Sequence, residues 1–204
     1  MNILVFSPHP DDAEVLVGGT IAKYTQKGHQ VLIVTVTVPN QKGKRTEESK
    51  KAAAILGARV SVLDVDPFKL AFDRNLVQLF DKVMSDFPPD IIYTSWINDS
   101  HQDHVSVSKA TIAAARKNDC SLYMYEQAIP SGITPYAFRP QAFVDISDTI
   151  EVKIKSVLAH ESQVQSFSEQ WIQSISGRAM YMGFRINVKY AEAFEVIKEI
   201  KVIE

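Results

Sequence analysis

The chain has 204 residues, of which 46% are hydrophobic and 23% are charged, and its formal net charge is −2. This length suits one domain with a sizeable core, spanning 1–204, and is short for two. The charge gives no global signal for a nucleic acid partner or an anionic membrane, and no apolar run approaches the roughly 20 residues that span a bilayer. Cys120 is the only cysteine, which excludes an intrachain disulfide. With no signal-like N-terminal segment either, we expect a soluble cytoplasmic protein.

The hydrophobic pattern alternates between strands and helices along the chain. Short β-branched runs predict strands, and longer mixed runs that end near glycine or proline predict helices. The predicted strands are 2–6, 31–38, 60–65, 91–95, 122–126 and 142–146. The predicted helices are 15–27, 45–56, 70–87, 105–117 and a run ending at residue 160, with further helix in the last third. This alternation is typical of an α/β fold, here a single-domain, Rossmann-like, mostly parallel sheet with helices on both faces.

The first predicted strand runs into a segment rich in proline and acid, Ser7-Pro8-His9-Pro10-Asp11-Asp12-Ala13-Glu14. Its polar side chains therefore lie at the carboxyl end of a strand, where open α/β sheets place their chemistry. A catalytic zinc ion takes about three protein ligands, among which imidazole and carboxylate are common, and keeps one position for water. His9 and Asp12 can supply two ligands, which leaves Asp11 free as a base. Alone, such a segment is more often a solvated turn whose aspartate caps a helix.

A second polar segment, Asp99-Ser100-His101-Gln102-Asp103-His104, follows the predicted strand 91–95. Parallel strands end at the same edge of a sheet, so we expect the two segments to meet there. One of the second segment's histidines is then the third metal ligand. An exposed first turn of the helix 105–117 would explain this segment alone. Together, in a chain with five histidines, the two segments favour a metal site.

These paired segments resemble the motifs of the PIG-L/LmbE-like deacetylases, metal-dependent enzymes that remove acetyl groups from N-acetylglucosamine-type sugars and their conjugates. The resemblance runs over nearly the whole chain. It is also carried by Gly18-Gly19-Thr20, Lys27-Gly28-His29, Arg45 with Glu47-Glu48, and the segments 52–57, 143–147, 160–163 and 190–194. It implies that His9, Asp12 and His104 hold one divalent ion. We expect Zn²⁺, although a site of two histidines and one aspartate accepts Fe²⁺ as well.

The resemblance also implies roles for residues around the ion. Asp11 matches the general base, and His101 matches the histidine that stabilises the oxyanion, which we expect to be protonated. Asp103 is interpreted as holding a histidine in its working orientation, although a carboxylate favoured at a helix N-terminus explains it too. Arg45 and Asp66 match substrate-binding positions. Their alternative interpretations are a solvated charge and an acidic turn residue.

Three further expectations concern the surroundings of the site. Some relatives have a tyrosine that assists the oxyanion where this chain has Asp99, and we expect this carboxylate to face solvent or a polar group of the substrate. The proline- and glycine-rich segment 129–140 is predicted to form a wall of the substrate pocket, or else a passive loop. Phe167 and Trp171 are predicted to pack in the core or an interface.

The predicted function is hydrolysis of the N-acetyl group of a small-molecule amino sugar or sugar conjugate. One alternative is a noncatalytic domain that binds a sugar or nucleotide. The other is a metal-dependent hydrolase of a different ester or amide, although phosphate esters commonly require two metal ions. Family members commonly assemble, so a homo-oligomer remains open.

Overall fold

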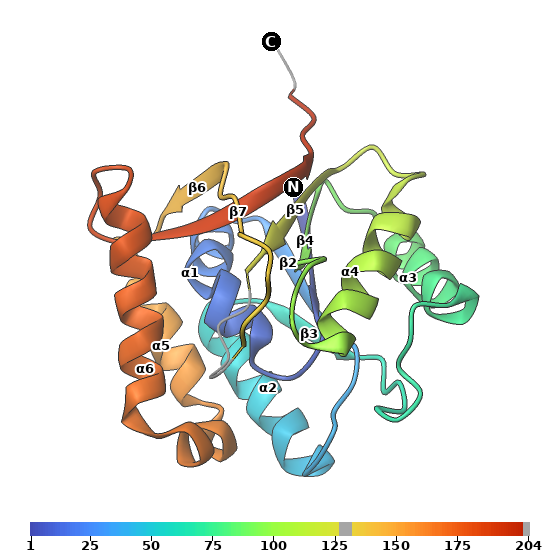
Figure 1. Ribbon diagram of the computed structural model, residues 1–204, viewed down its shortest axis with the longest axis horizontal. Helices are drawn as coiled ribbons and strands as arrows, with labels where there is room; N and C mark the ends of the chain where they lie inside the picture. Colours follow the sequence, from blue (N-terminus) through green and yellow to red (C-terminus); the bar gives the residue numbers. More distant parts are fainter. Residues whose placement is uncertain (127–131, 202–204) are drawn as a thin grey trace.

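The computed structural model describes residues 1–126 and 132–201 of the chain (Figure 1). Over these residues, helices flank one seven-stranded sheet. The strands are β1 Asn2–Ser7, β2 Gln30–Thr35, β3 Arg59–Val62, β4 Ile91–Ser95, β5 Ser121–Tyr125, β6 Ala142–Asp145 and β7 Ala191–Lys198. The helices are α1 Asp12–Gln26, α2 Lys42–Leu56, α3 Arg74–Asp86, α4 Gln102–Ala115, α5 Ile150–Leu158 and α6 Glu161–Phe184. None of these helices is long and apolar enough to cross a membrane.

The strand order is β3-β2-β1-β4-β5-β7-β6. Strands β1 to β5 pair in parallel, whereas β7 pairs antiparallel with both β5 and β6. The predicted α/β fold with a mostly parallel sheet is therefore confirmed. The sequence pattern did not predict β7, which inserts between two strands that precede it in the chain.

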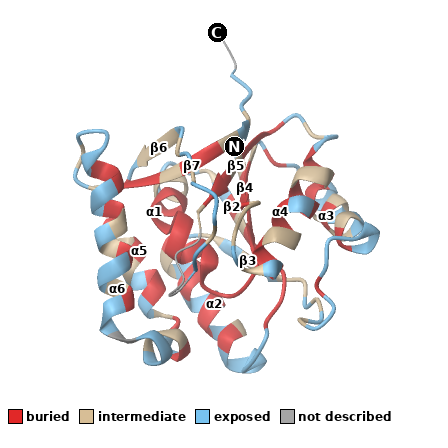
Figure 2. Ribbon diagram, viewed as in Figure 1, coloured by how far each residue is buried: buried red, intermediate tan, exposed pale blue. Residues whose placement is uncertain are grey.

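Helices cover both faces of the sheet (Figures 1 and 2). Alternate residues of β1 point to opposite faces, as the pleat of a strand requires. Ile3 and Val5 pack in a core with α1, α2, α5 and α6, whereas Leu4 and Phe6 pack in a second core with α3 and α4. Because β1 is buried on both faces, it has the continuous apolar sequence typical of a central parallel strand.

The first four helices begin at residues other than those predicted: α1, α2 and α4 begin three residues earlier, and α3 begins four residues later. Helix α3 begins at Arg74, because the Asp73 side chain caps it by accepting a hydrogen bond from the backbone N–H of Leu76 at 2.8 Å. Helix α4 begins three residues earlier than predicted, with His101 at its N-cap. As a result, His104 lies in the first turn of α4.

The centre of the sheet is a topological switch point. From β1 the chain adds β2 and β3 on one side, and β4 then returns to the other side of β1. Connections diverge above the carboxyl ends of β1 and β4, which creates the crevice where α/β proteins bind ligands. The two predicted polar segments follow these two strands.

Candidate metal-binding active site

The first polar segment forms a tight turn between β1 and α1. The Ser7 hydroxyl donates to the His9 carbonyl at 2.6 Å and accepts from the Ala13 backbone N–H at 3.1 Å. The His9 backbone N–H donates to Asp12 Oδ2 at 2.8 Å. Asp11 has a φ of 105°, in a region that residues other than glycine rarely adopt. Such strain persists only where the surrounding contacts hold it, and it clusters at functional sites.

The second polar segment forms the start of α4. His101 Nδ1 accepts a hydrogen bond from the Asp103 backbone N–H at 3.2 Å, so the histidine ring caps the helix. Asp99 Oδ1 accepts from the His101 backbone N–H at 2.8 Å. These bonds fix the turn that aims His104 at the end of β1.

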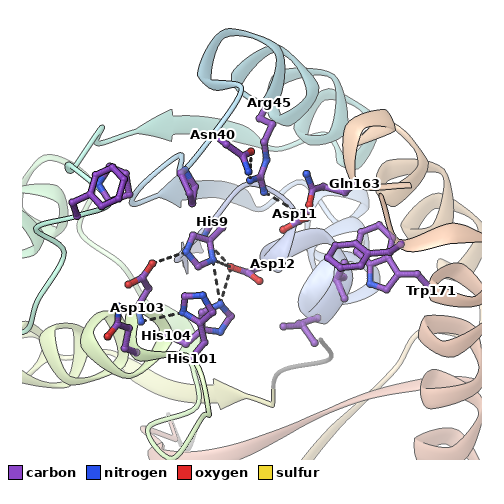
Figure 3. Close-up of a pocket in the computed structure, with 17 residues that line it drawn as sticks. His9, Asp11, Asp12, Asn40, Arg45, His101, Asp103, His104, Gln163 and Trp171 are labelled. Carbon is purple, nitrogen blue, oxygen red and sulfur yellow. Dashed lines mark hydrogen bonds and ion pairs between the residues drawn. The ribbon is translucent and has the colours of Figure 1, made fainter. Parts of the chain in front are cut away.

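His9, Asp12 and His104 converge on one point (Figure 3). His9 Nδ1 lies 3.5 Å from Asp12 Oδ2, His104 Nε2 lies 3.4 Å from the same oxygen, and the two nitrogens are 3.3 Å apart. A tetrahedral ion with ligand bonds of about 2.0–2.1 Å separates its ligand atoms by about 3.3–3.4 Å. The three donor atoms therefore fit one zinc-sized ion, with one position left for a further ligand.

Each histidine uses its other ring nitrogen on a second carboxylate. His9 Nε2 lies 2.8 Å from Asp103 Oδ2, and His104 Nδ1 lies 3.1 Å from Asp99 Oδ2. Such partners fix the ring orientation and raise the basicity of a ligating imidazole. The expectation that Asp99 faces solvent or substrate is wrong, because its side chain is buried against His104.

A second group of possible ligands, His9, His101 and Asp103, fits an ion less well. It would use His9 Nε2 and Asp103 Oδ2, which are 2.8 Å apart. That separation is normal for a hydrogen bond. It is shorter than the distance of about 3.3 Å between two ligand atoms of a tetrahedral zinc ion. The group with Asp12 and His104 is therefore the better metal site.

Electrostatics hold both candidate ligand histidines in their charged form. Burial lowers the pKa of His9, but contacts with Asp103 and Asp12 outweigh burial and raise it to about 8. Burial likewise opposes charge on His104, and contacts with Asp12 and Asp99 raise its pKa to about 10. Burial would raise the pKa of Asp12, yet the two histidines hold it well below its usual value.

Asp11 lies beside this group and titrates differently. Burial, followed by the charge of Asp12, raises the pKa of Asp11 to about 7, although nearby cations oppose the shift. One of these cations is Arg45, whose Nη2 lies 3.8 Å from Asp11 Oδ2 and donates to the Pro10 carbonyl at 2.9 Å. Its Nη1 donates to Asn40 Oδ1 at 3.3 Å. A carboxylate with a pKa near neutrality suits proton transfer at physiological pH.

The converging side chains line a cavity of about 510 Å³. It includes seven of the eight predicted site residues: His9, Asp11, Asp12, Arg45, His101, Asp103 and His104. Asp66 is absent from the cavity wall and instead accepts from the Phe68 backbone N–H at 3.0 Å. Its neighbours Pro67 and Phe68 line the cavity in its place.

Other parts of the wall were not predicted. Asn40 lines the cavity, and so do Gln163, Phe167 and Trp171 of α6. These three α6 residues follow one another at intervals of four, which places them on one helix face, and this spacing is the signal that could have found them. Trp171 also packs in the core, as predicted. Of the segment 129–140, residues 129–131 lie outside the described residues, and none of the described remainder lines the cavity.

The PIG-L family model, described as GlcNAc-PI de-N-acetylase, matches residues 4–115, more than half of the chain. The chain belongs to the PIG-L family. Both polar segments lie within the matched part, so the predicted resemblance is confirmed.

Individual relatives agree with this assignment. The chain is 29% identical to the diacetylchitobiose deacetylase of Thermococcus kodakarensis, over 96% of this chain and 83% of that protein. The conserved protein TT1542 from Thermus thermophilus has the same fold, with a TM-score of 0.86 and 24% identity over 98% of this chain and 96% of that one. GalB of Pseudomonas putida, a 4-carboxy-2-hydroxymuconate hydratase, reaches a TM-score of 0.84 at 19% identity over 100% and 98%. The PIG-L fold therefore does not by itself fix the reaction.

Proposed function

We propose that this PIG-L chain, as one domain over 1–204, is a metal-dependent hydrolase that removes the acetyl group from an N-acetylglucosamine-type sugar or sugar conjugate. The observation that carries the proposal is the triangle of donor atoms on His9, Asp12 and His104, with Asp11 beside it. The family match and the named activity of the Thermococcus relative support the same reaction.

His9, Asp12 and His104 would hold the ion, for which Zn²⁺ is the first candidate and Fe²⁺ the second. When bound, a divalent ion supplies Lewis-acid activation of water and of the amide carbonyl. Asp103 and Asp99 keep the two imidazole rings oriented toward the ion. The buried carboxylates and rings also limit the movement of the donor atoms, which keeps the site close to its working geometry.

Asp11 acts as the general base in this mechanism. Its carboxylate takes a proton from the attacking water and delivers a proton to the departing amine. Burial, followed by the charge of Asp12, raises the pKa of Asp11 to about 7 in the metal-free protein, and a carboxyl that titrates near neutrality suits both transfers. Arg45, at 3.8 Å, favours the ionised form and fixes the carboxylate against the cavity wall.

His101 stabilises the negative charge that develops on the carbonyl oxygen. Burial, followed by the nearby positive His9 and His104, lowers the pKa of His101, which favours a neutral ring over the imidazolium expected from the resemblance. Its Nδ1 accepts from the Asp103 backbone N–H, which leaves the proton on Nε2. His101 is half-buried on the cavity wall, where this N–H can donate to an oxyanion.

The fold also supports a hydratase in GalB, so the reaction must be tested directly. Acetate release is measured from N-acetylglucosamine, its β-linked dimer and an N-acetylglucosaminyl inositol, with Zn²⁺, with anaerobic Fe²⁺ and with a chelator. We expect release from at least one sugar, lost with chelator and in Asp11→Asn but retained in Asp119→Asn, which changes an exposed carboxylate outside the cavity. No acetate from any sugar with either metal, or release that survives the chelator, would refute the proposal.

A further inference from the structure

Phe68 is the most exposed large hydrophobic residue among those described, at 95%. It nevertheless lines the cavity that contains the candidate metal ligands. Phe72, on the same loop between β3 and α3, is 50% exposed and lies outside the cavity wall. A phenyl ring can bury 150–250 Å² of surface, roughly, when a partner covers it. An aromatic ring left uncovered at the mouth of a cavity is therefore a candidate ligand contact.

Hydrogen bonds anchor the loop between β3 and α3 that carries Phe68. The Val65 carbonyl accepts from the Thr37 hydroxyl at 2.6 Å, and the Val65 backbone N–H donates to the Val36 carbonyl at 3.0 Å. On the far side, Leu70 is buried in the core with α3 and α4. Between these anchors the turn at Asp66 holds the Phe68 backbone N–H. The turn and its anchors thus set the backbone position of Phe68.

The cavity has room beyond the residues that would bind the ion. Asp103 and Trp171 both line it and lie on opposite sides of His9 (Figure 3). An acetamido sugar placed with its amide at His9 therefore has cavity on either side. Phe68 comes from the loop after β3, an edge strand, whereas Trp171 comes from α6. The wall carrying Phe68 is thus separate from the wall formed by α6.

The chemistry of the wall indicates what covers the ring. Amide side chains of Asn40, Gln102 and Gln163 line the same cavity. An alkyl chain would displace water from these amides without replacing the lost hydrogen bonds. Such desolvation of a polar group costs free energy. A pyranose ring offers an apolar C–H face for Phe68 and hydroxyls for the amides. The mixed wall therefore favours a second sugar ring over an aliphatic chain.

We propose that Phe68 is a specificity-determining residue that stacks on a second sugar ring, joined to the acetamido sugar that is cleaved. The inference rests on the proposed function and adds to it a preference for acetamido sugars linked to another ring over free N-acetylglucosamine. It assigns that preference to one side chain.

The test is binding in the Zn²⁺-loaded Asp11→Asn protein, measured by calorimetry with N-acetylglucosamine, its β-1,4-linked dimer and its octyl glycoside. The dimer binds more tightly than the monomer. Adding Phe68→Ala reduces the ratio of their affinities about tenfold, which corresponds to the loss of about 55 Å² of apolar contact, roughly what one face of the ring covers. Adding Phe72→Ala is the matched control and leaves the ratio unchanged.

Equal affinity for monomer and dimer, or a ratio that survives Phe68→Ala, overturns the proposal. The proposal is also overturned if the octyl glycoside binds more tightly than the monomer by the same factor as the dimer and Phe68→Ala removes both gains in affinity equally. The surface around Phe68 would then accept any apolar group. Acetate release by the unaltered enzyme is measured separately. Failure of the deacetylase assignment thus appears as absent turnover, while the binding ratio still decides the role of Phe68.

Discussion

Binding of a divalent ion to His9, Asp12 and His104 is expected to expel about two protons at pH 7. The pKa of His9 is about 8 and that of His104 about 10, because contacts with carboxylates outweigh burial. At pH 7 the two rings then carry about 1.9 protons together, and both must leave because a ligating nitrogen needs its lone pair. At pH 9 the same pKa values leave about one proton to expel.

The affinity for the ion follows from the same count. It rises about 100-fold per pH unit between pH 6 and 7 and about tenfold per unit near pH 9, because each expelled proton adds one power of ten. Calorimetric titration with Zn²⁺ in two buffers of different ionisation enthalpy gives the proton number directly. A measurement at pH 6, where water on the ion keeps its protons, separates the histidines from ionisation of that water.

The variant Asp103→Asn tests whether one of the released protons comes from His9. Asp103→Asn removes the contact that does most to raise the pKa of His9, so the number released at pH 7 falls toward one. Asp119→Asn changes an exposed residue outside the cavity, and the number of protons released at pH 7 stays at about two. Release near zero in the unaltered protein, or a count that Asp103→Asn does not change, would refute the assignment of these histidines as charged before the ion binds.

Two variants of the candidate metal site and one of a buried ion pair elsewhere in the fold give further tests. Asp12→Ala lowers the metal content, measured by mass spectrometry after Zn²⁺ loading and dialysis, from about one ion per chain to well below one, because two ligands remain. Asp11→Asn keeps the metal but lowers kcat about 10²- to 10⁴-fold in the acetate assay, the range for loss of a general base; normal turnover would exclude that role. Lys153→Met leaves Glu192 without its buried ion-pair partner and reduces the unfolding free energy by about 3–5 kcal/mol in urea titrations, whereas Lys50→Met, at an exposed ion pair, changes it by less than about 1 kcal/mol. Equal effects of the two lysine variants would contradict the structure.

The parallel part of the sheet could be predicted because its signals are local. Strands β1, β2 and β4 are short β-branched or apolar runs, and turns rich in proline or glycine separate them from the helices. The antiparallel β7 could not be predicted in the same way. It lies between β5 and β6, and this position depends on pairing with residues 46 to 76 positions earlier in the chain. The position of β7 is therefore known only once the order of the strands in the sheet is known.

His9 and Asp12 could be predicted as candidate metal ligands from residue type and spacing, and His104 from the family resemblance. The orientation of the neighbouring side chains could not be predicted. Asp99 was expected to face solvent or a polar group of the substrate, because a carboxylate pointed at the oxyanion would oppose its stabilisation. The α4 turn instead directs one of its oxygens to the His101 backbone and the other to His104. Asp66 shows the converse, since its own turn directs the carboxylate to the Phe68 backbone N–H. Both outcomes depend on local backbone geometry that residue spacing does not specify.

The predicted exchange of two protons for one divalent ion would also explain how so many charges coexist at the end of β1. Removal of a proton from His9 and another from His104 takes away two positive charges, and the ion restores two at nearly the same place. The charge facing Asp12 and Asp103 is therefore conserved, and both imidazole rings keep their outer carboxylate partners throughout. The side chains need no large movement to accept the ion, because the protons hold the site together electrostatically until the ion replaces them. A pH low enough to retain both protons thus weakens metal binding without disrupting the arrangement of the site.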